Sequence, residues 1–385
     1  MSTLFGETES NRERGFLPTH DPLAHLPKPF NAWEEVARQL PKLLASDQFH
    51  RTITDLPPFP VGETHDSREL ERAMVLLSYF GHAYVWGSPQ PATVLPACLA
   101  VPWYEVATSL GRPPVLSYSS YALHNFFRFD PSREIECGNI GLIQNFLGGI
   151  DEEWFILIHI DIERRAAPAV ALLHACLDAA EASEIERLEA LLARVETSLR
   201  SMHTAMQRMP EHCDPYIYYH RVRPYIHGWK NHPDLPDGLI YEGVAAYGGR
   251  PQQFRGETGA QSSIVPSLDA MLGVAHQPDA LSLYLEQMRT YMPPAHRAFI
   301  ESLEARPSLR GFVQRCSRPR LTSAYNACVE AVENFRSLHL EYAAKYIFKQ
   351  AQTDLRNPHA VGTGGTPFMP YLKKHRDETA QNRLE

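Results

Sequence analysis

The stretch NFRSLHLEYAAKYI, residues 334–347, decides how the rest of the sequence is interpreted. It continues a three-and-four apolar spacing that predicts a helix from Ser323, as its N-cap, to about Phe348. One face of that helix carries Cys328, Ala331, Val332, Phe335, Leu338, His339, Tyr342 and Tyr346. A histidine in such a stripe is commonly a core residue satisfied by one hydrogen bond. A haem ligand needs the same setting, because a neutral imidazole must point from a rigid helix into a dry slot. Spacing alone does not distinguish a core histidine from a haem ligand.

The remainder of the chain predicts an all-α fold, with little period-two alternation. Helices are expected over residues 31–46, 67–80 and 181–206. The last of these carries a plain core stripe of Ile185, Leu188, Leu191, Leu192, Val195, Leu199, Met202 and Met206. Short helices and proline-rich loops suggest a small N-terminal domain over residues 1–146. Longer helices suggest a large helical domain over residues 147–385, with GGIDEE at the boundary.

Composition excludes several classes of protein. A net charge of -8 without a basic cluster argues against a nucleic-acid partner. The N-terminal segment is polar, and no apolar run approaches the roughly 20 residues of a membrane span, so neither a signal peptide nor a membrane partner is expected. The six cysteines are scattered, without CxxC or CxxCH, which favours a reducing, cytoplasmic location. A zinc enzyme is disfavoured because the 18 histidines form no HExxH or other compact set.

The helix around His339 resembles the helix that supplies the proximal haem ligand in the indoleamine 2,3-dioxygenase family. Further segments resemble that family in its order, so the resemblance runs from about Gly15 to Lys373. They are AYVWGSPQPATVLPACLAVPW, GRPPVLSYSSYALHNF, HGWKNHPDLPDGLIYEG, the AQSS of RGETGAQSSIVPSLDAMLG, YMPPAHRAFIESLEARPSLRGFV, AYNACVEAV and GTGGTPFMPYLK.

On the proximal side, the resemblance implies a b-type haem with His339 as the axial ligand of its iron. It also implies that Arg336 and Asp269 form a buried pair near the haem propionates, where the carboxylate orients the planar guanidinium. An ordinary interhelix ion pair is the alternative. Ser262, in the AQSS segment, is likewise expected at the cofactor.

On the distal side, Arg223 of RVRPYIHGWK resembles the arginine that binds the carboxylate of an amino-acid substrate; a surface or structural charge is the alternative. Thr363, within GTGGT, resembles the loop that closes over the substrate. The residues expected to line a flat indole pocket, and otherwise to be core, are Tyr118, Tyr121, Phe155, Tyr218 and Tyr219.

His159, in WFILIHIDIE, stands where animal members of the family have serine. The related tryptophan 2,3-dioxygenases use a distal histidine that accepts a hydrogen bond from the indole N–H, so the same catalytic role is implied for His159. Packing against another helix is the alternative. Tyr218 and Tyr219 replace phenylalanines and His227 replaces a serine, which makes the pocket more polar and leaves the identity of the indole open.

The function implied by the resemblance is insertion of O₂ across the indole C2–C3 bond by ferrous haem, converting L-tryptophan to N-formylkynurenine. An electron donor to reduce the iron is then a further partner. Two alternatives keep the fold and the haem. One is mono-oxygenation or ring rearrangement of an indole derivative in secondary metabolism. The other is a non-catalytic protein that binds haem and gas.

Overall fold

The computed structural model describes residues 13–46, 48–277, 280–353, 363 and 368–385. In these residues the regular secondary structure is almost all helical, with four short strands, so the predicted all-α fold is confirmed. The α-helices are α1 (Asn31–Ala45), α2 (Phe49–Thr54), α3 (Ser67–Trp86), α4 (Ala97–Ser109), α5 (Ile150–Val170), α6 (Leu173–Glu181), α7 (Ile185–Gln207), α8 (Pro215–Ile217), α9 (Ile264–Leu272), α10 (Ala280–Arg289), α11 (Pro294–Glu304), α12 (Leu309–Cys316), α13 (Pro319–Ala343), α14 (Lys349–Thr353) and α15 (Phe368–Ala380).

Short elements connect these helices. Two-stranded ladders join β1 (Val94–Leu95) to β4 (Ile240–Tyr241) in parallel and β2 (Phe126–Arg128) to β3 (Ile140–Leu142) antiparallel. The 3₁₀ turns are η1 (Lys28–Phe30), η2 (Val61–Glu63), η4 (Met209–Glu211), η6 (Arg223–Ile226), η7 (Ala245–Tyr247) and η8 (Gly259–Gln261). The π-helical segments are η3 (Ser119–Leu123), η5 (Tyr218–Val222) and η9 (Ala344–Phe348).

The predicted helices are present, with two errors at their starts. The helix expected from residue 181 begins at Ile185, because Ser183 adopts a left-handed conformation with φ of 58° and separates α6 from α7. The helix expected to start at Ser323 begins at Pro319, with Arg318 at the N-cap. A proline in the first turn loses no hydrogen bond, so Ser323 lies inside the helix.

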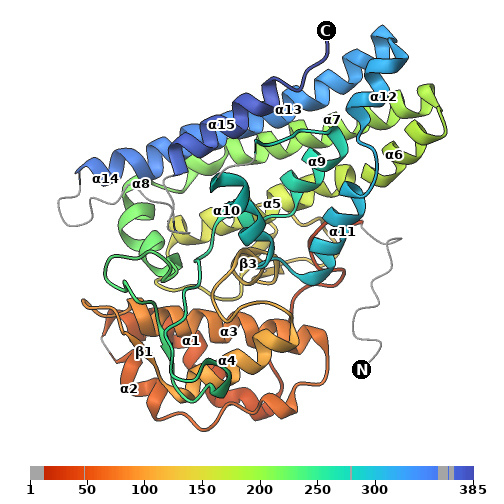
Figure 1. Ribbon diagram of the computed structural model, residues 1–385. Coiled ribbons are helices and arrows are strands. Elements are labelled where there is room, and N and C mark those ends of the chain that lie inside the picture. The colour runs from red at the N-terminus through yellow and green to blue at the C-terminus, as the bar shows by residue number, and fades with distance from the viewer. Residues whose placement is uncertain (1–12, 47, 278–279, 354–362, 364–367) are drawn as a thin grey trace.

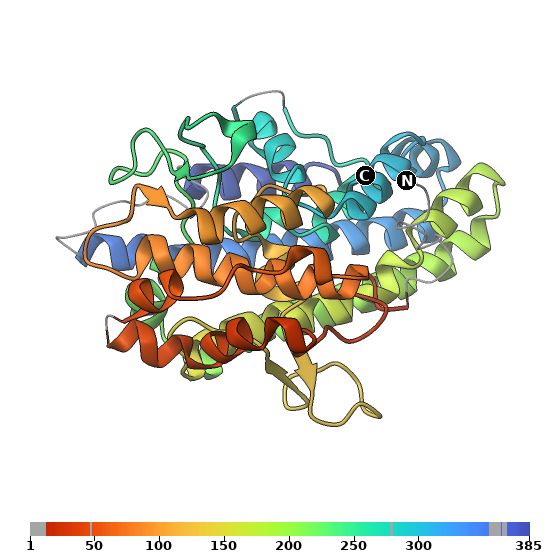
Figure 2. The same ribbon diagram turned by 90° about the horizontal axis from the view of Figure 1, so that it is seen from below.

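The long helices α5, α7, α13 and α15 lie side by side at one end of the molecule, and α1–α4 gather at the other (Figure 1). Seen from below, the N-terminal helices lie in front of α13 (Figure 2). Each group has its own apolar core, and α5 serves both: Leu157 and Ile160 belong to the first core, whereas Ile158 and Ile162 belong to the second. The first core also takes in Trp229 and Leu239, so the packing does not follow the sequence boundary.

The start of α5 shows why the chain turns at GGIDEE, the predicted domain boundary. Gly148 and Gly149 both have positive φ, which other residues rarely adopt. Glu152 then folds back and accepts hydrogen bonds from the backbone N–H groups of Phe146, Leu147 and Gly148. The division into domains over residues 1–146 and 147–385 remains a prediction.

Two further features bear on the composition analysis. Among the described residues, no helix combines the length and the apolar character needed to cross a membrane. All six cysteines are free thiols.

Candidate active site

His339 lies where the packing of α13 changes. The N-terminal part of the apolar stripe, including Cys328 and Val332, is buried against α7, and the Cys328 thiol donates to the Leu192 carbonyl at 3.3 Å. Toward the C-terminal end, Phe335 is only partly buried and His339 is exposed. The described side chains therefore leave this part of an apolar helix face uncovered.

The surroundings of His339 differ from those of a satisfied core histidine. No described residue forms a hydrogen bond with its ring. Desolvation lowers the pKa of His339 to about 4, and His159 and Arg336 add to the effect. An imidazole that is accessible and yet desolvated lies in a recess of the protein, not on its outer face. The structure thus supports a neutral imidazole with a lone pair available for a ligand.

Arg336 lies one helical turn before His339 and forms a bidentate ion pair with Asp269 of α9. Its two terminal nitrogens are 3.0 and 2.6 Å from the two carboxylate oxygens, and both side chains are about nine-tenths buried. Burial opposes ionisation, but Arg336 and His276 hold the pKa of Asp269 below its usual range. The predicted pair therefore forms, with the fork-to-fork geometry that fixes a guanidinium in one plane.

His159 projects from α5 into an aromatic cluster. Its Nδ1 lies 2.7 Å from the Phe155 carbonyl oxygen. Because a carbonyl can only accept, Nδ1 carries the hydrogen, and desolvation lowers the pKa of His159 and keeps the ring neutral. The remaining nitrogen, Nε2, is therefore a hydrogen-bond acceptor. His159 also contributes to the low pKa of His339, so the two imidazoles lie within electrostatic range of each other.

The predicted pocket residues assemble around His159. The Phe155 ring centroid lies 4.6 Å from His159 and 4.5 Å from Tyr218, and the Tyr118 ring is 5.9 Å from His159. Tyr121 lies 6.3 Å from Phe155, and its buried hydroxyl has no hydrogen-bond partner among the described residues. These rings come from the loop before η3, η3 itself, α5 and η5. Three parts of the chain that are distant in sequence thus build one aromatic wall.

Arg223 is buried, with an exposed fraction of 1 %, which rules out the alternative of a surface charge. It begins η6 directly after the π-helical η5, and its guanidinium carbon lies 5.3 Å from the centre of the Tyr219 ring. Desolvation lowers the pKa of Arg223. A guanidinium in this setting gains more from an anionic ligand than an exposed one would.

Thr363 is placed by contacts with two segments, one at Glu257 and one at Gly228, the residue after His227. Its hydroxyl donates to the Glu257 carbonyl at 2.5 Å, and its own carbonyl accepts from the Gly228 N–H at 3.4 Å. Gly228 and Gly256 lie backbone against backbone, so a Cβ on either would clash. Residues 362 and 364–366 of the GTGGT segment lie outside the described residues.

Comparison with known proteins places the whole chain in one group. A family model described as Indoleamine 2,3-dioxygenase matches residues 9–382. Human indoleamine 2,3-dioxygenase 2 is 35 % identical, over 97 % of this chain and 94 % of the relative. Saccharomyces cerevisiae indoleamine 2,3-dioxygenase is also 35 % identical, over 95 % and 90 %. A protein named Myoglobin from Haliotis madaka is 30 % identical, over 96 % of each chain. The chain belongs to the indoleamine 2,3-dioxygenase family.

Two buried carboxyl groups of this indoleamine 2,3-dioxygenase family member were missed in the sequence. Glu163 is one turn beyond His159 on α5, and its Oε1 accepts from the hydroxyls of Tyr118, at 2.9 Å, and Ser262, at 2.8 Å. Desolvation raises the pKa of Glu163 to about 7 and that of Glu257 to about 8. The spacing of His159 and Glu163 on one helix was a usable signal for the first; nothing local marked the second.

The π-helical segments are a second feature of the family member that the sequence did not reveal. Segment η3 contains Tyr121, η5 contains Tyr218 and Tyr219, and η9 directly follows the helix of His339. A π-helical turn adds one residue and rotates the side chains that follow, and such turns recur at functional sites. All three border the predicted site.

Proposed function

We propose that this chain is a haem-dependent dioxygenase that inserts both atoms of O₂ across the C2–C3 bond of an indole. L-tryptophan is the proposed substrate and N-formylkynurenine the proposed product. The observation that carries the proposal is the arrangement of His339, an accessible imidazole without a hydrogen-bond partner among the described residues, within electrostatic range of the neutral acceptor His159. Membership of the indoleamine 2,3-dioxygenase family supports it.

The residues present fit a b-type haem. His339 would hold the iron, because its ring is neutral and the surrounding helix face is apolar and uncovered. Arg336, oriented by Asp269, would pair with a propionate. Ser262, whose hydroxyl donates to Glu163, would approach the cofactor from the side of α5. When bound, the ferrous haem supplies the binding and activation of O₂.

The residues of the chain would bind and orient the substrate. The rings of Tyr118, Phe155 and Tyr218 would hold the indole plane, and Nε2 of His159 would accept a hydrogen bond from the indole N–H. The buried Arg223 would pair with the substrate carboxylate, and Thr363 would close one side of the pocket. Orientation and exclusion of water are the contributions of the protein to such a reaction.

The proposal includes partners and a location. An electron donor is needed to bring the iron to its ferrous state, and a cytoplasmic location is supported by the six unpaired cysteines. Neither a nucleic acid nor a membrane is a proposed partner.

Product analysis tests the proposal. Haem-loaded protein would be reduced anaerobically and then mixed with ¹⁸O₂ and a panel of indoles, including both enantiomers of tryptophan. Two labelled oxygen atoms in the product are expected. One labelled atom would instead indicate the mono-oxygenase or ring-rearranging alternative.

Reversible O₂ binding without turnover is a second candidate function, motivated by the relative named Myoglobin. The same experiment separates it from the first. A stable oxygen complex that leaves every indole of the panel unchanged would favour oxygen binding and overturn the proposed dioxygenase activity.

A further inference from the structure

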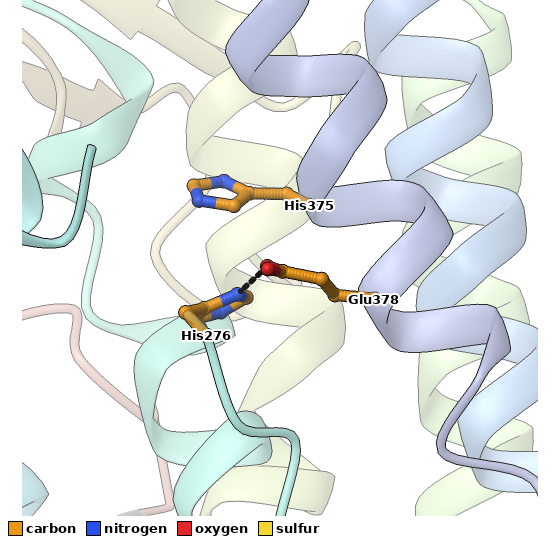
Figure 3. A group of neighbouring side chains, drawn as sticks. All are labelled: His276, His375 and Glu378. Carbon is orange, nitrogen blue, oxygen red and sulfur yellow. Dashed lines mark hydrogen bonds and ion pairs between the residues drawn. The ribbon is translucent and has the colours of Figure 1, made fainter. Parts of the chain in front are cut away.

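A compact group of histidine and glutamate side chains lies beside the Arg336–Asp269 pair. His276 follows α9, whereas His375 and Glu378 project from one side of α15 toward it (Figure 3). One nitrogen of each histidine and one carboxylate oxygen lie within 4.8 Å of one another. Nδ1 of His276 donates to Glu378 at 2.6 Å, and the two imidazole rings are 4.4 Å apart. Within the described part of the chain, no other group of this kind occurs.

His375 gives an independent sign that something is bound here. The side chain is more than nine-tenths buried, and its Nε2 has no hydrogen-bond partner among the described residues. A buried polar atom left without a partner is costly, so such atoms commonly mark the place of an ion or water. Figure 3 shows the His375 ring beside the His276 ring and the Glu378 carboxylate.

The outer partners of the group suit a metal ion. Nε2 of His276 lies 3.3 Å from a carboxylate oxygen of Asp269, which is itself held by Arg336. If a metal replaces the proton on Nδ1 of His276, the proton leaves to solvent and Nε2–H continues to donate to Asp269. A carboxylate that orients a metal-bound imidazole in this way is the usual outer partner of a histidine ligand.

Charge and donor type decide which metal fits. Glu378 is also paired with Lys374 at 3.5 Å, and Asp269 with Arg336. The carboxylates are therefore largely neutralised, so a hard cation such as Mg²⁺ or Ca²⁺ would gain little. Two imidazole nitrogens and one carboxylate oxygen instead suit Zn²⁺, with a fourth position left for water.

Ligand spacing and access also allow a zinc ion. Zinc ligands lie about 2.0 to 2.2 Å from the metal, so small side-chain rotations would bring the three atoms into its shell. Glu378 also lines an open cleft of about 680 Å³ with Gln277 and Lys374, which gives an ion a route from solvent.

We propose that His276, His375 and Glu378 form a zinc site that joins the segment after α9 to the C-terminal helix α15. The site is separate from His339, and it does not depend on the proposed oxygenase activity.

Zinc binding to the haem-loaded, tag-free protein tests this proposal. After chelation and dialysis, the protein would be titrated with Zn²⁺ and, separately, with Mg²⁺, and the bound metal measured by mass spectrometry. One zinc per chain is expected, with a rise in the unfolding temperature, because a ligand that binds only the folded state stabilises it. Absorption at the zinc edge should show two imidazoles and oxygen at about 2.0 to 2.1 Å.

Three variants control the measurement. His375→Gln and Glu378→Gln should each weaken zinc binding by more than the roughly 10- to 100-fold typical of losing an outer partner. His65→Ala, at an exposed histidine, should bind zinc as the wild type does. Haem content and circular dichroism, measured on the same samples, show that each variant is folded. No zinc bound to the wild type, equal binding by the Gln variants, or sulfur ligands at about 2.3 Å would each overturn the proposal.

Discussion

Two buried carboxyl groups near the proposed haem site behave in opposite ways. Glu163 accepts hydrogen bonds only from hydroxyl groups, and desolvation raises its pKa to about 7. Asp269 is also buried, but the Arg336 guanidinium and the His276 ring hold its pKa below the usual range. Hydroxyl donors thus do not offset the cost of burying a carboxylate, whereas a bidentate guanidinium does.

The contrast separates the two sides of the proposed site. The side of α5, with His159 and Glu163, consists of aromatic rings and groups that favour their neutral forms. The side of α9, α13 and α15 is ionic, with Asp269 and Arg336 paired. A neutral, apolar side suits an indole ring, and an ionic side suits propionates.

The largest effect is expected on haem binding, from replacement of His339, which lies one helical turn after Arg336 on the ionic side. His339→Ala should abolish stoichiometric haem binding, because the described residues offer no other unbonded imidazole on the uncovered face of α13. Haem per chain and the absorption spectrum of the ferrous protein would be measured. His65→Ala is the matched control. Full haem content with an unchanged ligand spectrum in the His339 variant would contradict the assignment.

The second prediction concerns how stability depends on pH, and it tests the contrast between the protonated Glu163 and the ionised Asp269. The pKa of Glu163 is raised from 4.5 to about 7, so the folded state favours the protonated acid. Its stabilisation is complete below the unfolded value of 4.5 and is lost as pH rises through 7. A shift of this size corresponds to roughly 3 kcal/mol in the free energy of unfolding.

Glu163→Gln provides the test, because glutamine keeps an acceptor for Tyr118 and Ser262 but does not ionise. Urea unfolding of wild type and variant would be compared at pH 5 and pH 7.5. The wild type should lose stability relative to the variant between these values. Parallel pH profiles for the two proteins would show that Glu163 is ionised in the folded state.

Periodicity and resemblance to a family were enough to predict the fold and several of the contacts in the candidate site. The apolar stripe around His339, the pairing of Arg336 with Asp269 and the aromatic cluster at Phe155 were all expected, and each is present. The helix starts were wrong because local backbone geometry at Ser183 and Pro319 overrides side-chain pattern.

What could not be predicted depends on tertiary contacts. His276 and Glu378 are 102 residues apart, and within the group only His375 and Glu378 are close in sequence, three residues apart on α15. This is why the absence of a compact motif argued against zinc, while folding brings the same residue types together. Glu257 is likewise buried, next to the close approach of Gly228 and Gly256, and no local pattern records either feature.

A smaller effect, on kcat/KM, is expected from replacement of Arg223, a cation on the otherwise neutral, aromatic side of the site. Arg223→Ala should lower kcat/KM for tryptophan roughly ten- to a hundredfold, since a hydrogen bond to a charged group contributes about 1.5 to 3 kcal/mol. Tryptamine, which lacks the carboxylate, should respond much less. Equal losses for both substrates would indicate that Arg223 supports the pocket structure and does not bind the carboxylate.

The smallest effect concerns His159, whose neutral Nε2 is the acceptor that the aromatic side offers. If this atom accepts the indole N–H, methylation at N1 removes the hydrogen bond and places a methyl group against the imidazole. One neutral hydrogen bond contributes about 1 kcal/mol, so kcat/KM for N1-methyltryptophan should be several-fold below that for tryptophan. His159→Ser should narrow this ratio, because the smaller side chain makes room for the methyl group. An unchanged ratio in the serine variant would return His159 to a packing role against Tyr118 and Phe155, and the proximal assignments would stand without it.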